Sequence, residues 1–172
     1  MDVRTLVRLS AVVASLAAST ACTDESHDLQ VAALGGEAPG VPKGPTHRPG
    51  QPCLVCHGGL GPASHQFVMA GTVYEVQGET GGAKGASVQI EDVNGNFYTA
   101  TTNEVGNFYI TTDQWVPTLP AQVMVFQGQN SQQMVTHIGR DGSCAGCHVQ
   151  PPSPVSPGPV YVTAGALPDG GL

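Results

Sequence analysis

The sequence ASVQIEDVNGNFYTATTNEVGNFYIT, residues 86–111, alternates apolar and polar side chains in short runs. This period of two is typical of half-buried β-strands, because successive side chains of a strand point to opposite faces of a sheet. The pair Asn94-Gly95 is typical of a tight hairpin turn, and the residues from Asn103 to Gly106 predict a second turn. The stretch therefore predicts three consecutive strands, near residues 86–91, 97–101 and 108–111.

Further strands are predicted on both sides of this stretch. Val68 to Val76 precedes it, and Ala121 to Phe126 and Met134 to Ile138 follow it. Six or seven short strands at near-regular spacing are typical of a small β-sandwich. We therefore expect a mainly β protein whose sandwich occupies residues 67–135.

One turn of the predicted sandwich has the spacing of a calcium loop. Asp92, Asn94 and Asn96 alternate as calcium ligands do. An EF-hand, however, has Gly where Phe97 stands here and Glu where Asn103 stands. We interpret the three polar residues as turn residues.

The regions outside the sandwich are rich in proline and glycine. The chain of 172 residues contains 23 Gly and 14 Pro, and most of the prolines lie before residue 53 or after residue 148. Such composition favours irregular structure over a packed core. We expect residues 22–45 to form a flexible tether. Residues 151–172 are expected to form a Pro/Gly-rich C-terminal tail, in which Val160 to Val162 can add an edge strand.

Residues 1–21 have the features of an export signal. Two arginines near the start precede the short apolar stretch from Leu9 to Ala18, and small residues then lead to Cys22. The end resembles a bacterial lipoprotein signal, which implies lipidation of Cys22, although Ser19 stands where that signal has an aliphatic residue. The alternative is an ordinary signal peptidase site that leaves Cys22 as a free thiol. Either way we expect an exported protein, periplasmic or anchored as a lipoprotein in a bacterial outer membrane.

Charge and hydropathy exclude two classes of function. Six Lys and Arg stand against 13 Asp and Glu, a formal net charge of −7, whereas a nucleic-acid binder needs a basic face. We therefore expect no nucleic-acid partner. After the signal there is no apolar run of the length that crosses a bilayer, so we do not expect a protein with a membrane-spanning helix.

The other four cysteines occur in two copies of one motif, CLVCH at residues 53–57 and CAGCH at residues 144–148. The pattern C-x-x-C-H is the attachment sequence of c-type haem. Its two thiols add to the haem vinyl groups, and the adjacent histidine reaches the iron as proximal ligand. The sequence therefore predicts two covalent haem c groups, attached through Cys53, Cys56, Cys144 and Cys147 and ligated by His57 and His148.

Three other uses of these cysteines are open. A structural zinc site can use two C-x-x-C pairs, and an exported chain can form disulfides, but neither requires a histidine after each pair. A thioredoxin-like redox pair requires a βαβ context, which this sequence does not predict. The repeated histidine therefore favours haem.

The second axial ligand of each iron is predicted from an internal repeat. Both motifs follow a Thr-His pair, an Arg and a Gly-containing loop, which suggests His47 and His137 as distal ligands. His65 is the alternative for the first haem, and axial methionines are a further alternative. His27 is expected to ligate nothing. The haem segments then span residues 46–66 and 136–150, and the candidate methionines are Met69, Met124 and Met134.

Residues 68–127 resemble the carboxypeptidase regulatory-like domain. The resemblance rests on Gly71-Thr72-Val73, on residues 85–90, on Asn94-Gly95-Asn96-Phe97 and on residues 101–110, with Asn103 in place of the family's Asp. It implies a small transthyretin/Ig-like β-sandwich that serves as a structural or interaction module and not as a peptidase. Irregular haem-binding segments and Pro/Gly-rich tails would flank this module.

Taken together, these features resemble a small di-haem c-type cytochrome lipoprotein of the bacterial envelope. The resemblance implies an electron carrier and not an enzyme. Its partners would be redox proteins, such as other cytochromes or a reductase or oxidase, and the membrane through the lipid anchor. The alternatives are a peroxidase-like haem enzyme and a redox- or gas-sensing lipoprotein that binds partners through the sandwich.

Overall fold

The computed structural model describes residues 24–163. The chain divides into two compact units, Met1–Leu34 and Gly35–Leu172. The predicted signal and Cys22 lie outside the described residues. No helix within residues 24–163 is both long enough and apolar enough to cross a membrane.

The described part of the first unit is a helix, α2 (Glu25–Ala33), within the segment expected to be a flexible tether. Asp24 precedes it, and its carboxylate accepts a hydrogen bond from the His27 amide at 3.2 Å. Such a cap satisfies a backbone donor that has no partner inside the helix. No residue of α2 is buried.

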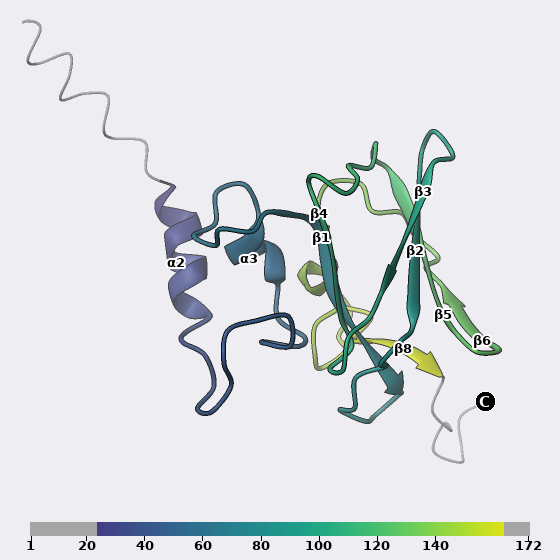
Figure 1. Cartoon of the computed structure of the whole chain (residues 1–172), viewed down its shortest axis with the longest axis horizontal. Helices are drawn as coiled ribbons and strands as arrows, with labels where there is room; N and C mark the ends of the chain where they lie inside the picture. The colour runs from purple at the N-terminus through teal and green to yellow at the C-terminus, as the bar shows by residue number, and fades with distance from the viewer. Residues whose placement is uncertain (1–23, 164–172) are drawn as a thin grey trace, which may run out of the picture. The chain divides into compact units, whose positions relative to one another are not determined.

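The second unit contains two β-sheets, which confirms the predicted mainly β sandwich (Figure 1). In the first sheet, β1 (Phe67–Val76) pairs antiparallel with β4 (Asn107–Thr111) and parallel with the short strands β7 (Gly142–Ser143) and β8 (Val160–Thr163). The second sheet has the order β3 (Phe97–Thr101), β2 (Ser87–Asp92), β5 (Ala121–Gln127) and β6 (Asn130–Gln133).

The core lies where the apolar faces of the two sheets meet. β2 shows the alternation that the sequence predicts, since Val88 and Ile90 are fully buried while Glu91 between Ile90 and Asp92 is exposed. The rest of the core comes mainly from β1, β4 and β5, and it includes Met69, Val73, Phe108, Ile110 and Val125.

One predicted strand is wrong. Residues Met134 to Ile138 form no strand, and only Ile138 makes an isolated bridge, to Ala121. The chain turns immediately after β5 at Gly128, whose φ is +61°, so β6 begins at Asn130. All four residues of β6 are polar and exposed, which explains why hydrophobic patterning missed this strand.

The C-terminal tail contributes to the fold up to residue 163. The strand expected near Val160 is β8, and its Val162 is buried beside β1. Asn130 Nδ2 donates to Thr163 Oγ1 at 3.1 Å, which ties β8 to β6 of the other sheet. The sandwich therefore includes chain from both sides of the second C-x-x-C-H motif.

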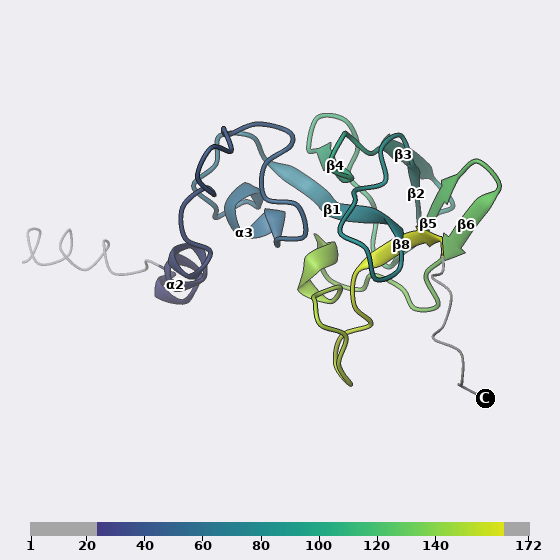
Figure 2. The same ribbon diagram turned by 90° about the horizontal axis from the view of Figure 1, so that it is seen from below.

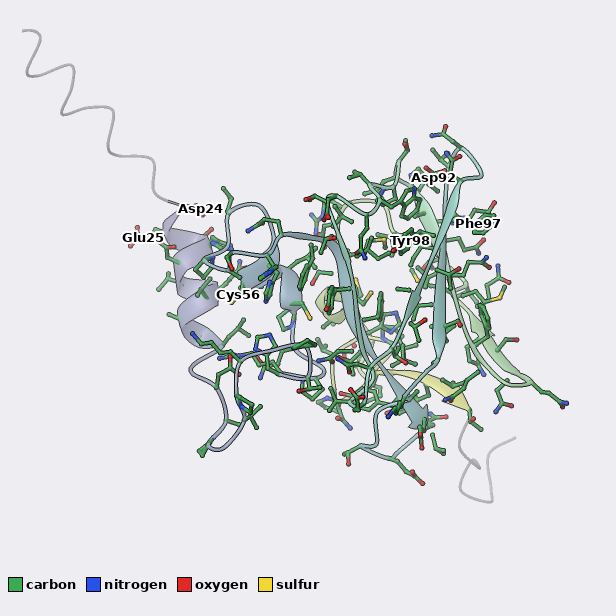
Figure 3. All side chains as sticks on the ribbon, in the orientation of Figure 1. Asp24, Glu25, Cys56, Asp92, Phe97 and Tyr98 are labelled. Carbon is green, nitrogen blue, oxygen red and sulfur yellow. The ribbon has the colours of Figure 1, made fainter. Side chains whose placement is uncertain are left out.

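Asp92, the last residue of β2, organises the turn that follows the strand, as the interpretation of its side chain as turn chemistry expects (Figure 3). One of its carboxylate oxygens accepts from the amides of Asn94 and Asn96 at 2.9 and 3.0 Å. The other accepts from the Thr118 amide at 3.2 Å. Burial alone would raise the pKa of Asp92, but these hydrogen bonds outweigh burial and hold the pKa below its usual 3.8.

This lowered pKa predicts a pH-dependent contribution to stability. The ionised Asp92 stabilises the fold above pH 3.8, the usual pKa of the group in an unfolded chain, and the contribution disappears as pH falls through the lower folded pKa. Asp92→Asn keeps an acceptor oxygen but removes the charge. We expect the midpoint of thermal unfolding of Asp92→Asn to lie below wild type at pH 6 and to approach it in strong acid. A difference that grows on acidification would contradict this assignment.

Candidate haem sites

The first motif forms a short helix, α3 (Cys53–His57), which contacts β1 and β7. The loop before it is tied to the first sheet by a chain of hydrogen bonds. The Gly50 amide donates to Thr72 Oγ1 at 2.7 Å, and that hydroxyl donates to Asn107 Oδ1 at 2.7 Å. Asn107 Nδ2 in turn donates to the His47 carbonyl at 2.9 Å. Two polar side chains of β1 and β4 therefore position the loop that carries His47.

The second motif begins directly after β7, in the 3-10 helix η1 (Cys144–Gly146), which also contacts β1. Cys144 lies over Gly71 of β1. A Cβ added at Gly71 would lie 2.7 Å from Cys144 Cβ and 3.0 Å from its sulfur. The absence of a side chain at Gly71 therefore lets the second motif rest on the sheet.

The structure brings the two motifs together beside β1 (Figure 2). A cavity of about 300 Å³ is lined by residues 49–52, which directly precede the first motif, and by Cys144, Ala145 and His148 of the second. Burial of its sulfur raises the pKa of the Cys144 thiol to about 12, and the neighbouring Cys53 thiol adds to this rise. Burial likewise raises the pKa of Cys53. Both thiols are therefore protonated at neutral pH.

The two motif histidines have the same hydrogen-bond geometry. His57 Nδ1 lies 2.8 Å from the carbonyl oxygen of His65, and His148 Nδ1 lies 2.8 Å from that of Gly158. A carbonyl oxygen only accepts, so each Nδ1 carries a proton, and in the neutral ring Nε2 is then the nitrogen with the lone pair. Metal-binding histidines commonly have this arrangement, because a bond at one ring nitrogen orients the other toward the metal.

An aromatic stack fixes the ring plane of His57. The ring centroids of His57 and Phe67 are 4.2 Å apart with an interplanar angle of 5°, and Tyr109 stacks on the far side of Phe67 at 4.6 Å and 13°. β1 and β4 supply these two aromatic residues at neighbouring positions of the sheet. Both the ring plane and the free nitrogen of His57 are thus set by the sandwich.

His47 lies beside His57. Their ring centroids are 5.9 Å apart with an interplanar angle of 79°. Two imidazoles on opposite sides of one iron have centroids roughly 6 Å apart, because each metal–nitrogen bond is about 2 Å long. His47 Nδ1 lies 3.1 Å from Glu37 Oε1, so the carboxylate accepts a hydrogen bond from Nδ1–H, and Nε2 is the ring nitrogen left to bind a metal. This spacing would allow both rings to bind one haem iron.

His65 is the alternative distal ligand predicted for the first haem. It contacts His57 through its backbone carbonyl. Its own ring is exposed and lies against Ser64 Oγ, 3.3 Å from Nδ1. Among the candidate methionines, Met69 is buried in the sandwich core, and Met124 lies in β5. In this structure His47 is therefore better placed than His65 or Met69 to serve the first haem.

His137 shares a groove with the second motif. The groove has a volume of about 1110 Å³, above the roughly 300–1,000 Å³ of common ligand pockets. Its lining includes residues 132–141, several residues between positions 150 and 161, and Cys144, Cys147 and His148 of the second motif. The groove thus contains both attachment thiols, the motif histidine and the predicted distal histidine of the second haem.

The four described cysteines are free thiols. Within residues 24–163 no three His, Cys, Asp or Glu side chains converge as they would around a metal ion. A structural zinc site uses four such ligands, whereas a haem iron takes one or two from the protein.

A buried serine shapes the loop that orients His148. Ser156 Oγ accepts from the amides of Val149 and Gly158 at 3.1 and 3.2 Å and lies 2.8 Å from the Cys147 carbonyl. Gly158 supplies the acceptor for His148. Ser156 therefore holds both ends of the loop between the second motif and β8.

Replacement of Ser156 by Ala leaves these buried backbone groups without their partner. We expect the free energy of unfolding to fall by about 1–3 kcal/mol, the usual cost of an unsatisfied buried group. Ser153→Ala is the matched control, because Ser153 is exposed in the same loop and accepts one amide hydrogen bond. Urea unfolding of the two haem-loaded variants checks the difference, and equal losses would contradict the role of Ser156.

Sequence reasoning missed the residues that orient the histidines. Glu37, Phe67, Ser156 and the carbonyls of His65 and Gly158 act on the motifs from outside them. Only Phe67, an aromatic residue at the start of β1 and ten residues after His57, could have been noticed in the sequence as a candidate contact of the motif histidine. Backbone carbonyls carry no residue-type signal, and Glu37 lies in the segment interpreted as a tether.

Comparison of the chain with protein-family models, with curated proteins and with solved structures finds no match. The functional assignment therefore depends on the residues and their geometry.

Proposed function

We propose that this chain is a di-haem c-type cytochrome that transfers electrons in the bacterial envelope. Haem c supplies a one-electron couple between ferrous and ferric iron. Cys53, Cys56, Cys144 and Cys147 would attach the two haems, with His57 and His148 as proximal ligands. His47 and His137 would be the distal ligands.

One observation carries the proposal. The histidine of each C-x-x-C-H motif donates Nδ1–H to a backbone carbonyl at 2.8 Å, so both present Nε2 as a free ligand. The acceptors lie eight and ten residues downstream, in loops of unrelated sequence. A zinc or disulfide role for the cysteines would not require both histidines to be oriented in the same way.

The chain's residues would act by holding the ligands and keeping them rigid. Phe67 and the His65 carbonyl fix the His57 ring, and the loop centred on Ser156 fixes the His148 ring. A rigid ligand set favours electron transfer, because little of the protein has to reorganise when the charge on the metal changes. The formal net charge of −7 favours redox partners with a basic docking face.

Binding of small external ligands separates the carrier from the alternatives. If all four axial positions are filled by histidine, carbon monoxide and cyanide should leave the spectrum of the native protein unchanged. Because His137 is exposed in a groove, the second haem is where an external ligand would most readily replace a histidine. Ready binding there would favour a peroxidase-like enzyme or a gas-sensing lipoprotein.

The proposed cellular location depends on Cys22. Lipidation at Cys22 would anchor the protein to the membrane surface, and residues 22–45 would connect the anchor to the sandwich. Cys22→Ser is expected to move the protein from the membrane fraction to the soluble periplasmic fraction. An unchanged distribution would contradict the lipid anchor and leave haem attachment untouched.

A further inference from the structure

Glu37 connects the predicted distal ligand of the first haem to a cation. Its Oε1 lies 3.1 Å from His47 Nδ1 and 3.1 Å from Arg48 Nε. The three side chains are largely covered, with exposed fractions of 20% for Glu37, 26% for His47 and 18% for Arg48. The second carboxylate oxygen, Oε2, is buried and has no hydrogen-bond partner among the described residues.

Arg48 holds this carboxylate in place. Its φ of +51° lies in the left-handed region, which non-glycine residues adopt at a cost and only where their surroundings require it. The guanidinium group also donates to Gln51 Oε1 at 2.9 Å and to the Gly35 carbonyl at 2.5 Å. Arg48 thereby ties residues 35–37 to the loop before the first motif and fixes Glu37 against His47.

The other candidate ligands lack such a contact. The proximal histidines His57 and His148 donate to neutral backbone carbonyls. His137 is exposed, and its ring makes no hydrogen bond to any other residue between positions 24 and 163. Among the four predicted axial histidines, His47 alone is hydrogen-bonded to a carboxylate within the described chain.

We propose that Glu37 is a positioning residue that makes His47 a stronger electron donor to the first haem iron and so gives this haem the lower reduction potential of the two. The inference rests on the proposed haem attachment. A carboxylate that accepts a hydrogen bond from Nδ1–H raises the basicity of Nε2. A more basic ligand stabilises ferric iron over ferrous iron, which lowers the potential. The two haems would then differ in potential, which gives the transferred electron a preferred direction.

The test uses the full haem-loaded chain and three variants. Glu37→Gln keeps the size and an acceptor oxygen but removes the charge, Glu37→Asp keeps the charge on a shorter side chain, and Glu91→Gln removes one charge from the exposed face of β2 in the other sheet. Haem per chain is measured first. Spectroelectrochemical titration then gives the two midpoint potentials, and the low-spin electron paramagnetic resonance signals report the ligand field.

We expect Glu37→Gln to bind as much haem as wild type, to raise the lower of the two midpoint potentials and to shift one low-spin signal. Glu37→Asp should shift the same midpoint potential and the same low-spin signal in the same direction but by a smaller amount. Glu91→Gln should not change the potential or the signal of one haem relative to the other. If Glu37→Gln and Glu91→Gln have the same potentials and signals, with haem content intact, the role of Glu37 is overturned and the proposed function is not. If Glu37→Gln does not fold, an unshifted potential and signal in Glu37→Asp would equally overturn that role. A wild-type chain without covalent haem would instead overturn the proposed function.

Discussion

Replacement of both Cys53 and Cys56 by alanine is expected to halve the covalent haem of the mature chain. The proposal assigns these two thiols to one haem and Cys144 and Cys147 to the other, so the second haem should attach as before. The pyridine haemochrome spectrum, set against protein concentration, measures the loss. The double replacement of Cys144 and Cys147 should give the same halving.

Cys22→Ala is the matched control for this experiment, because it removes a cysteine that belongs to neither motif. Its haem content per chain should equal that of wild type. A chain without Cys53 and Cys56 that keeps its full haem content would show that the first motif is not an attachment site. Loss of all haem from that chain would show that the two motifs do not act as independent sites.

Gly71→Val is expected to separate the second motif from the sandwich. A Cβ at this position would lie 2.7 Å from Cys144 Cβ and 3.1 Å from the Phe108 ring, and valine adds two further methyl groups. Neither neighbour can move freely, since Phe108 is buried in the core and Cys144 follows β7 directly. Overpacking of this kind costs about 1–3 kcal/mol. For a chain of this size that corresponds to a fall of roughly 2–12 °C in the thermal midpoint.

Gly81→Val is the control, because a Cβ at Gly81 would meet nothing within 4 Å. Thermal unfolding of the two haem-loaded variants, followed by circular dichroism, gives the comparison. The account requires a large loss for Gly71→Val and a small one for Gly81→Val. Similar midpoints for both would mean that Cys144 does not rest on β1 as the structure places it.

The sandwich could be predicted where local signals agree. Strands β1 to β5 were expected close to their observed positions because apolar residues alternate there and because Asn-Gly and Asn-x-x-Gly turns separate the strands. The β6 strand was missed because Asn130 to Gln133 are polar on both faces. The two-residue β7 strand has no pattern of its own, since it forms only by pairing with β1.

For the candidate site, the sequence predicts which residues take part but not how they are arranged. The C-x-x-C-H motifs identify the thiols and histidines because covalent attachment requires these residues at this spacing. The surroundings of those residues depend on long-range contacts. Glu37 is ten residues from His47, and Tyr109 reaches His57 only through Phe67 on a neighbouring strand. No local pattern encodes such contacts, which follow from how the loops pack on β1 and β4.

The most direct test of the central claim is the haem content and ligation of the mature protein, expressed in a periplasm that contains haem-attachment machinery. We expect two covalent haems per chain, a low-spin spectrum and no weak methionine–iron band. A chain that carries no haem and holds zinc or disulfides at its four motif cysteines would contradict the central claim, and the protein would then be an exported β-sandwich with another role.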